Sequence, residues 1–357
     1  MSLERLPLEN ELPGSDYRRN QIRSMIFLIG LFLLLVFAFM LSLRAGSYNT
    51  PIVEMIKGIA GKATDDKINI VVLNNRLPRI LTAIIAGAGL GVSGCILQAI
   101  LRNPLASSST LGVSQGAGFG AAFAIIVLNA DSLGLLSRAT IPLCAFAGSM
   151  SVAFIILGLS KIRQIPPEGI VLAGVAISAM LTGATTLLQY FADEIQLATL
   201  VFWTFGDLGS TNRVDISLMG GVVLIISIYY ILHRWDYNAL LSGLETAISL
   251  GINVGRFTMI NMILCCFTAA TIVSYIGLIS FIGLAAPHIV RRVVGNNHAY
   301  LIPGSILAGS TLLLLGDLFS RTIASPIILP IGAITSFLGG PLFLYLLFKG
   351  GIKRVDC

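Results

Sequence analysis

Two glycine-rich stretches of the sequence have spacings that support chemistry in other proteins. Residues 89–94 fit the G-x-G-x-x-G fingerprint of dinucleotide sites, and residues 112–116 fit the G-x-S-x-G elbow that presents a nucleophilic serine. Both patterns need a β-strand that turns into a helix, whereas both stretches lie inside long apolar runs. Residues 58–62 end in Gly-Lys but lack the spacing of a phosphate-binding loop. We therefore interpret these glycines as helix-packing residues, and we predict no nucleotide site and no catalytic residue.

The cysteines and histidines do not form a metal-binding pattern. The five cysteines show no C-x-x-C spacing and have no histidine near them at ligand spacing. We interpret them as small apolar packing residues with reduced thiols, and His288 as a packing or hydrogen-bonding residue. The prediction is that this chain itself binds no metal and no cofactor.

Composition places the chain in a membrane. Of its 357 residues, 55% are hydrophobic and only 11% are charged, and the mean hydropathy is +0.89. Soluble domains do not reach this balance. The net charge of +6 includes no long basic run, which indicates loop orientation rather than nucleic-acid binding. We predict one transmembrane domain over residues 25–350, with cytoplasmic tails over residues 1–24 and 351–357.

Hydropathy predicts the spanning helices, each of which needs about 20 mainly apolar residues. Nine segments meet this requirement, and a tenth, residues 278–290, is shorter and contains Pro287 and His288. Counting the tenth as a span places most of the 23 basic residues on the cytoplasmic side, as the positive-inside rule requires. We therefore predict an all-α protein with ten transmembrane helices and both termini cytoplasmic. The other nine spans are residues 25–43, 79–101, 110–128, 139–159, 169–191, 215–232, 257–276, 301–319 and 331–348.

Two further features indicate a transporter rather than a simple anchor. Glycines recur every four residues within 87–91 and 112–120, which lets helices approach closely in lipid. The connection over residues 233–256 is polar yet helical in pattern, with Gly243, Gly251 and Gly255 as breaks. It is predicted to be a structured cytoplasmic loop.

Motifs distributed along most of the chain are similar to those of one transporter family. They are Arg76-Leu-Pro-Arg79, the glycine run 87–94, Gln98, Asn103-Pro-Leu-Ala106, and the stretches 111–117, 172–176, 277–291, 315–321, 329–332 and 339–343. In this content and order the sequence resembles the FecCD, or BtuC-like, family of ABC-importer permeases.

The resemblance implies a type II ABC importer architecture and a transport role without catalysis. Such a permease moves a bulky metal chelate, namely a ferric siderophore, haem or vitamin B12, across the cytoplasmic membrane of a bacterium or archaeon. The expected partners are two ATP-binding subunits that hold ATP and Mg, a periplasmic or lipid-anchored substrate-binding protein, membrane lipid, and a second copy or a paralogous permease. Nucleic acid is not an expected partner.

The resemblance also assigns two contact sites. Residues 245–251 look like the E-A-A-x-x-x-G coupling signature, with Thr246 in place of the middle alanine. The expected ATPase contacts are Leu244, Glu245, Ala247, Leu250 and Gly251.

On the outer face, the resemblance assigns docking of the substrate-binding protein to Arg76, Arg79 and Arg321. For all three, anchoring in the lipid headgroups is an alternative. Arg321 has a further alternative, an ion pair with Asp317 one helical turn earlier.

A translocation path and a gate follow from the same comparison. The path is expected along the fifth span, which offers small, weakly polar groups suited to a wide channel of low affinity. Its expected residues are Ser178, Thr182, Thr185, Thr186 and Gln189. The cytoplasmic gate is expected at Pro166, Pro167 and Glu168.

An ion-coupled secondary transporter is the alternative function. That class needs carboxylates within the membrane and usually shows inverted repeats. Asp317 is the only plausible buried acid in the sequence, and we see no clear internal repeat.

Overall fold

The computed structural model describes residues 13–45, 51–130, 137–163 and 167–351, and all regular secondary structure in these ranges is helical. The all-α prediction is confirmed for them. In chain order the elements are α1 (Pro13–Arg44), α2 (Ile52–Ile59), α3 (Asp66–Val71), the π-helical turn η1 (Val72–Arg76), α4 (Leu77–Ile100), α5 (Val113–Ala122), the π-helical turn η2 (Phe123–Val127), α6 (Ser137–Arg163), α7 (Pro167–Tyr190), α8 (Glu194–Phe205), α9 (Arg213–Leu232), α10 (Arg234–Leu241), α11 (Leu244–Ser249), α12 (Val254–Ile276), α13 (Ile282–Val294), α14 (His298–Thr322) and α15 (Ile331–Gly351).

Seven of the described helical segments are long and apolar enough to cross a bilayer, and each coincides with a predicted span. They contain α1, α4, α6, α7, α9, α12 and α14. The other three predicted spans coincide with α5 plus η2, with α13 and with α15. The number of crossings and the side on which the termini lie stay predictions.

Local structure differs from the prediction in three places. α1 begins at Pro13, well before the apolar run, because the polar residues that follow are compatible with helix. The predicted span 110–128 becomes helical only at Val113, since Gly112 before it has a left-handed φ of 82°. α8 was not predicted, because 12 residues are too few for a hydropathy search to detect as a span. A capping box of Asp193 and Gln196 begins it.

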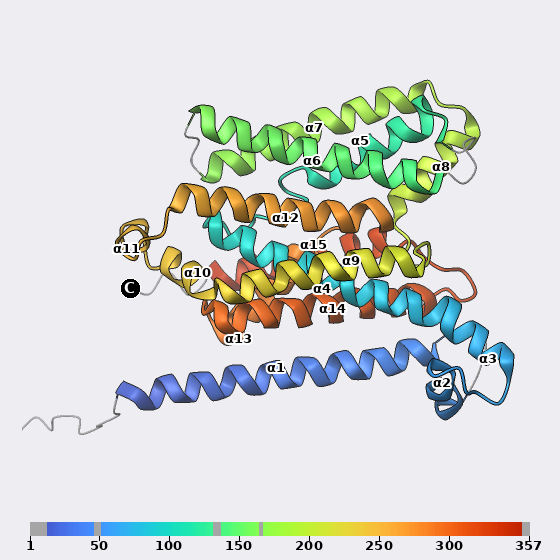
Figure 1. The fold of residues 1–357 in the computed structure, drawn as a ribbon, viewed down its shortest axis with the longest axis horizontal. Helices are drawn as coiled ribbons and strands as arrows, with labels where there is room; N and C mark the ends of the chain where they lie inside the picture. The colour runs from blue at the N-terminus through green and yellow to red at the C-terminus, as the bar shows by residue number, and fades with distance from the viewer. Residues whose placement is uncertain (1–12, 46–50, 131–136, 164–166, 352–357) are drawn as a thin grey trace, which may run out of the picture.

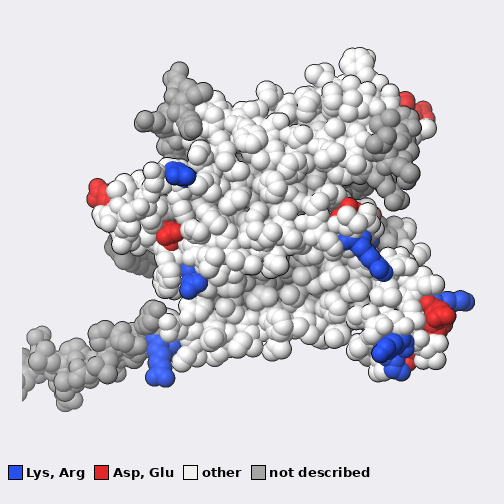
Figure 2. Space-filling model, in the orientation of Figure 1, with Lys and Arg blue, Asp and Glu red and all other residues white. Residues whose placement is uncertain are grey.

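The long helices lie side by side, with short helices at both ends of the bundle (Figure 1). The beginning of α1 lies at the same end as α10 and α11, while α2, α3 and α8 lie at the opposite end, which we name the outer end (Figure 1). On the face shown in Figure 2, the charged side chains of the described residues gather towards the two ends, and the band between them is uncharged. Such a band matches the hydrocarbon layer of a membrane.

α4 is the central helix of the bundle. It packs against α9, α12, α13 and α14. In its most apolar window 83% of the residues are buried, against 17% for α1 and for α7. α1 and α7 are therefore peripheral helices that present apolar side chains outward, to lipid or to another chain.

Glycines allow α4 to approach its neighbours at backbone distance. At Gly87 and Gly91 the backbone of α14 stands where a Cβ would be, and at Gly94 the backbone of α13 does. α5 and α6 meet in the same way, at Gly116 with Gly148. The interpretation of both glycine motifs as packing residues is thus confirmed, because tight van der Waals packing is what holds helices together in lipid.

This packing predicts that Gly94→Ala separates α4 from α13. The added methyl group overlaps the carbonyl of Gly283, so we expect a loss of about 1–3 kcal/mol, the usual cost of overpacking. Thermal unfolding in detergent measures it. The matched control is Gly221→Ala on α9, where an added methyl meets nothing within 4 Å. Equal melting temperatures for the two variants would contradict the packing assignment.

Candidate functional site

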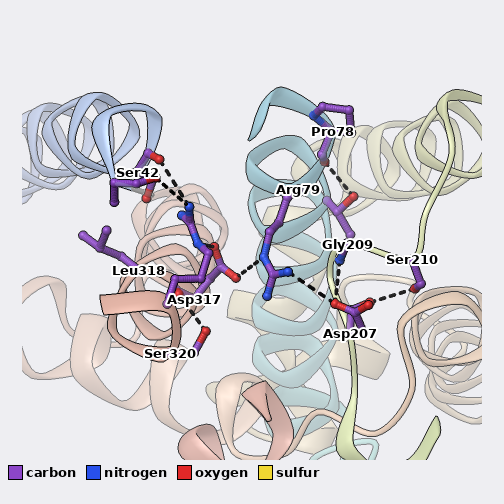
Figure 3. Close-up of polar contacts among 12 residues, drawn as sticks. Ser42, Pro78, Arg79, Asp207, Gly209, Ser210, Asp317, Leu318 and Ser320 are labelled. Atoms are coloured by element: carbon purple, nitrogen blue, oxygen red, sulfur yellow. Dashed lines mark hydrogen bonds and ion pairs between the residues drawn. The ribbon is translucent and has the colours of Figure 1, made fainter. Parts of the chain in front are cut away.

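At the outer end, one arginine joins two aspartates from distant parts of the chain (Figure 3). Arg79, in the first turn of α4, donates from Nε to Asp317 Oδ1 on α14 at 2.7 Å. Its Nη1 lies 3.4 Å from Asp207 Oδ1, in the turn between α8 and α9. The side chain of Asp317 is fully buried, whereas that of Asp207 is 55% exposed. Arg79 therefore has one strong internal bond and one weak bond at the surface.

The second oxygen of Asp317 is held by Arg321. Arg321 lies one turn further along α14, and its Nε donates to Asp317 Oδ2 at 2.9 Å. Its Nη1 also reaches the carbonyl oxygens of Ser42 and Ala45, at 3.5 and 3.3 Å. Ser42 lies in the last turn of α1 and Ala45 directly follows that helix, so the guanidinium caps its end. The ion pair offered as an alternative for Arg321 is present.

Arg76 also binds the end of α1. It ends η1, is 7% exposed, and donates from Nη1 to the carbonyl of Leu43 at 2.6 Å. The same nitrogen contacts Met55 Sδ on α2 at 3.4 Å. All three arginines are thus largely buried and bonded inside the chain. Their predicted contact with a substrate-binding protein stays a prediction.

The short helix α2 closes the outer end over Arg76. Its Met55 is fully buried, while Glu54 accepts hydrogen bonds from Lys57 and from the backbone of Thr64. The bond from Lys57, and then that from Thr64, lower the pKa of Glu54 to about 2. A lowered pKa stabilises the folded loop above the ordinary value of 4.5, and this contribution is lost as the pH falls from there towards 2.

At the opposite end, α10 and α11 form a short projecting helix pair. Gly243 and Gly251 bound α11 with φ angles of 130° and 84°, which other residues adopt only under strain. Ala247 is fully buried and anchors α11, while Leu244 and Leu250 are exposed. Glu245 is exposed as well. A hydrogen bond joins this pair to the bundle: the hydroxyl of Tyr237 on α10 donates to Asn261 Oδ1 on α12 at 2.5 Å.

Comparison with known proteins assigns the chain to a family. Residues 34–349 match the model of the FecCD transport family. The chain belongs to the FecCD transport family.

Relatives along almost the whole length agree with this assignment. An ABC transporter permease protein of Methanocaldococcus jannaschii is 46% identical over 93% of this chain and 95% of its own. The hemin transport system permease protein HmuU of Yersinia pestis is 36% identical over 82% of this chain and 87% of its own. A metal-chelate type ABC transporter, solved in an inward-facing conformation, has a TM-score of 0.79 at 30% identity and covers 90% of this chain and 98% of its own. This FecCD protein is a multi-pass, non-catalytic permease subunit, and ATP hydrolysis belongs to a separate subunit.

In this FecCD permease the predicted path residues are spaced to lie along one side of α7, but they differ in exposure. Thr182 and Thr186 are exposed, whereas Ser178, Thr185 and Gln189 are partly buried. Ser178 also packs against α5 at Gly112. The hydroxyls of all four Ser and Thr residues donate to the carbonyl one turn earlier in α7, at 2.8–3.0 Å. They add little hydrogen-bonding capacity to the surface of the helix.

The predicted gate falls mostly outside the described part of the permease. Pro166 lies outside the described residues, and Pro167 and Glu168 begin α7 with side chains that are not described. Asp207 was not predicted as a member of the group of charged residues at the outer end, which we name the outer cluster: Arg76, Arg79, Arg321, Asp207 and Asp317. It is 128 residues from Arg79 in sequence, and no local pattern brings the two together.

The geometry of the outer cluster predicts that its two aspartates contribute very differently to stability. Asp317→Asn leaves Arg79 and Arg321 without the buried carboxylate that both contact, and breaking a buried pair costs about 3–5 kcal/mol. Asp207→Asn removes one long, exposed contact, worth less than about 1 kcal/mol. Thermal unfolding of both variants in one detergent measures the contrast. Equal losses of stability would show that Asp317 does not hold the outer end together.

Proposed function

We propose that this chain is the membrane permease of an ATP-driven importer for a bulky metal chelate: a ferric siderophore, haem or vitamin B12. The observation that carries the proposal is family membership over nearly the whole chain, together with relatives whose names state transport of hemin and of metal chelates. The membrane is the cytoplasmic membrane of a bacterium or archaeon. A substrate-binding protein delivers the chelate at the outer end.

Two ATP-binding subunits dock on the α10–α11 pair and supply the energy. An exposed apolar knob supports this. Leu244 and Ile248 on the six-residue α11 are 47% and 62% exposed, and Leu250 directly after it is 67% exposed. Solvent-facing apolar side chains at this density suit burial against a partner. A second copy of the chain, or a paralogous permease, completes the channel beside α7.

The chelate passes along α7 without being held tightly. Because the hydroxyls of Ser178, Thr182, Thr185 and Thr186 are engaged within the helix, the wall offers few free donors to a ligand. Selection of the cargo then belongs to the substrate-binding protein. The gate at Pro166, Pro167 and Glu168 closes this path on the cytoplasmic side.

The outer arginines attract the substrate-binding protein through their field. Arg76, Arg79 and Arg321 outnumber Asp207 and Asp317, so the cluster keeps a positive charge although its members are paired. Such a charge speeds association with an acidic surface. Arg79 is the member next to the exposed Asp207, so its guanidinium is the one that an incoming carboxylate can reach.

Ion-coupled transport is not favoured by the geometry. Among the residues that the structure describes, Asp317 is the buried acid available for proton or sodium coupling. Both of its carboxylate oxygens bond arginines, which leaves no ready site for a proton or a sodium ion.

If the α10–α11 pair contacts the ATPase, then negative charges on its exposed leucines should disrupt that contact. Leu244→Asp with Leu250→Asp should abolish co-purification with the ATPase, and with it the change in ATP hydrolysis caused by loaded binding protein in nanodiscs. The matched control is Val53→Asp on α2, an apolar residue 59% exposed at the outer end, which should leave ATPase association unchanged. Uptake driven by an ion gradient in vesicles of this chain alone would contradict the importer proposal.

The docking assignment predicts a salt-dependent contact at the outer end. Arg76→Gln with Arg79→Gln should weaken binding-protein association at least about tenfold, which corresponds to about 1.4 kcal/mol. The association rate with the unaltered permease should fall as ionic strength rises. Arg213→Gln, an exposed outer arginine at the start of α9, is the control. An association rate independent of salt would contradict the assignment.

A further inference from the structure

A small pit opens at the end of the molecule that carries α10, beside the end of α4. Its volume is about 260 Å³, and its lining includes Arg102, Arg291, Gln98 and His298. Leu241 and Asn296, both exposed, stand at its rim. The pit is thus open to solvent at the rim, and its lining comes from α4, α10, α13, α14 and the turns after α4 and α13.

The walls of the pit are positively charged. Arg102 is exposed and donates once, to the carbonyl of Leu240 at 3.1 Å, while Arg291 is half-buried. Neither takes part in any ion pair found among the described residues. The 25-residue α14 also begins at the pit, with His298 as its first residue, so its positive dipole end points there. The occupant must therefore carry negative charge.

The base of the pit presents two acceptors instead of donors. Gln98 is 3% exposed, and its Nε2 faces the carbonyl of Leu284 at 3.5 Å, so Oε1 is the free end. His298 is 1% exposed, and its Nδ1 lies 2.9 Å from Asn238 Oδ1, which also accepts the backbone N–H of His298. Nδ1 must therefore carry the proton, and Nε2 of the neutral ring is an acceptor without a partner.

We propose that this pit binds a phosphate group that still carries a P–OH. Its charged oxygens accept from Arg102 and Arg291, as guanidinium groups bind phosphate. Its hydroxyl donates to Gln98 Oε1 or His298 Nε2, both of which are otherwise buried without a hydrogen bond. Sulfate, which has no proton at neutral pH, and phosphodiesters satisfy the walls but not the base.

Two sources supply this chemistry: free inorganic phosphate in the cytoplasm and a lipid whose headgroup is a phosphate monoester. The exposed rim and the small volume accept either one. Both sources make the same demand on Arg102 and His298, so the binding chemistry is tested first and the source second.

The first experiment measures binding of inorganic phosphate and of sulfate to the full-length permease in nanodiscs, by calorimetry at matched ionic strength and neutral pH. We expect phosphate to bind at least tenfold more tightly than sulfate. Arg102→Met should lower phosphate affinity at least tenfold, and Arg256→Met, an exposed arginine outside the pit, should leave it unchanged. His298→Leu, which leaves Gln98 as the remaining buried acceptor, should reduce the preference for phosphate over sulfate, with melting curves confirming that each variant is folded.

The second experiment assigns the source. Native mass spectrometry compares nanodiscs of phosphatidic acid, a monoester, with nanodiscs of phosphatidylglycerol, a diester. One phosphatidic acid retained per chain and displaced by inorganic phosphate identifies a lipid, and phosphate binding without retention identifies the free ion. Equal affinity for sulfate and phosphate, an Arg102→Met variant with undiminished binding, or no binding of either source would overturn the proposal. All of these readouts use the permease alone, so they stand apart from the importer assignment.

Discussion

Backbone-to-backbone contact along α4 is the constraint on which the other features of the structure depend. In lipid, helices gain little from burying apolar side chains against each other, so they associate where small residues allow close approach. Gly87, Gly91 and Gly94 provide that approach to α13 and α14. Once α4 is packed against α13 and α14, the positions of its two ends are fixed as well. Its first turn carries Arg79 to the buried Asp317, and its last turn carries Gln98 to the pit.

The polar interactions lie at the two ends of this apolar frame and do different work there. At the outer end a buried carboxylate shared by Arg79 and Arg321 joins α4 to α14, while Arg321 also caps the last turn of α1. Such a cluster is expensive to break, because each remaining charge would be buried without a counter-charge. At the other end no described ion pair holds the projecting α10–α11 pair; it is held by hydrogen bonds, such as those from Tyr237 to Asn261 and from Arg102 to the carbonyl of Leu240.

This division suits the proposed function, in which energy and selectivity come from other proteins. On the face shown in Figure 2 the middle band is uncharged, and the hydroxyls of Thr182 and Thr186 on α7 are engaged within the helix, so these surfaces offer few groups that would hold a ligand tightly. The exposed features that could recognise a partner are the α11 knob and the surface around Asp207. Both are rigidly supported, the first by the buried Ala247 and the second by a turn in which the backbone N–H of Gly209 donates to Asp207.

Residue types and spacing alone determined the class of the protein: a helical membrane bundle packed at glycines, with a helical loop broken at Gly243 and Gly251. These follow from composition and short-range patterns, which the sequence displays directly. The FecCD family was inferred differently, from the resemblance of motifs along the chain to those of known permeases, and the family match over residues 34–349 shows it. Only the tertiary structure decided that Arg76, Arg79 and Arg321 are turned inward, that Asp207 joins Arg79, and that Arg102, Arg291, Gln98 and His298 surround one pit. These groupings join residues up to 238 positions apart. Hydropathy and local motifs report which residues a helix contains. Which faces meet is set by backbone approach between helices, and that has no signature in any one segment.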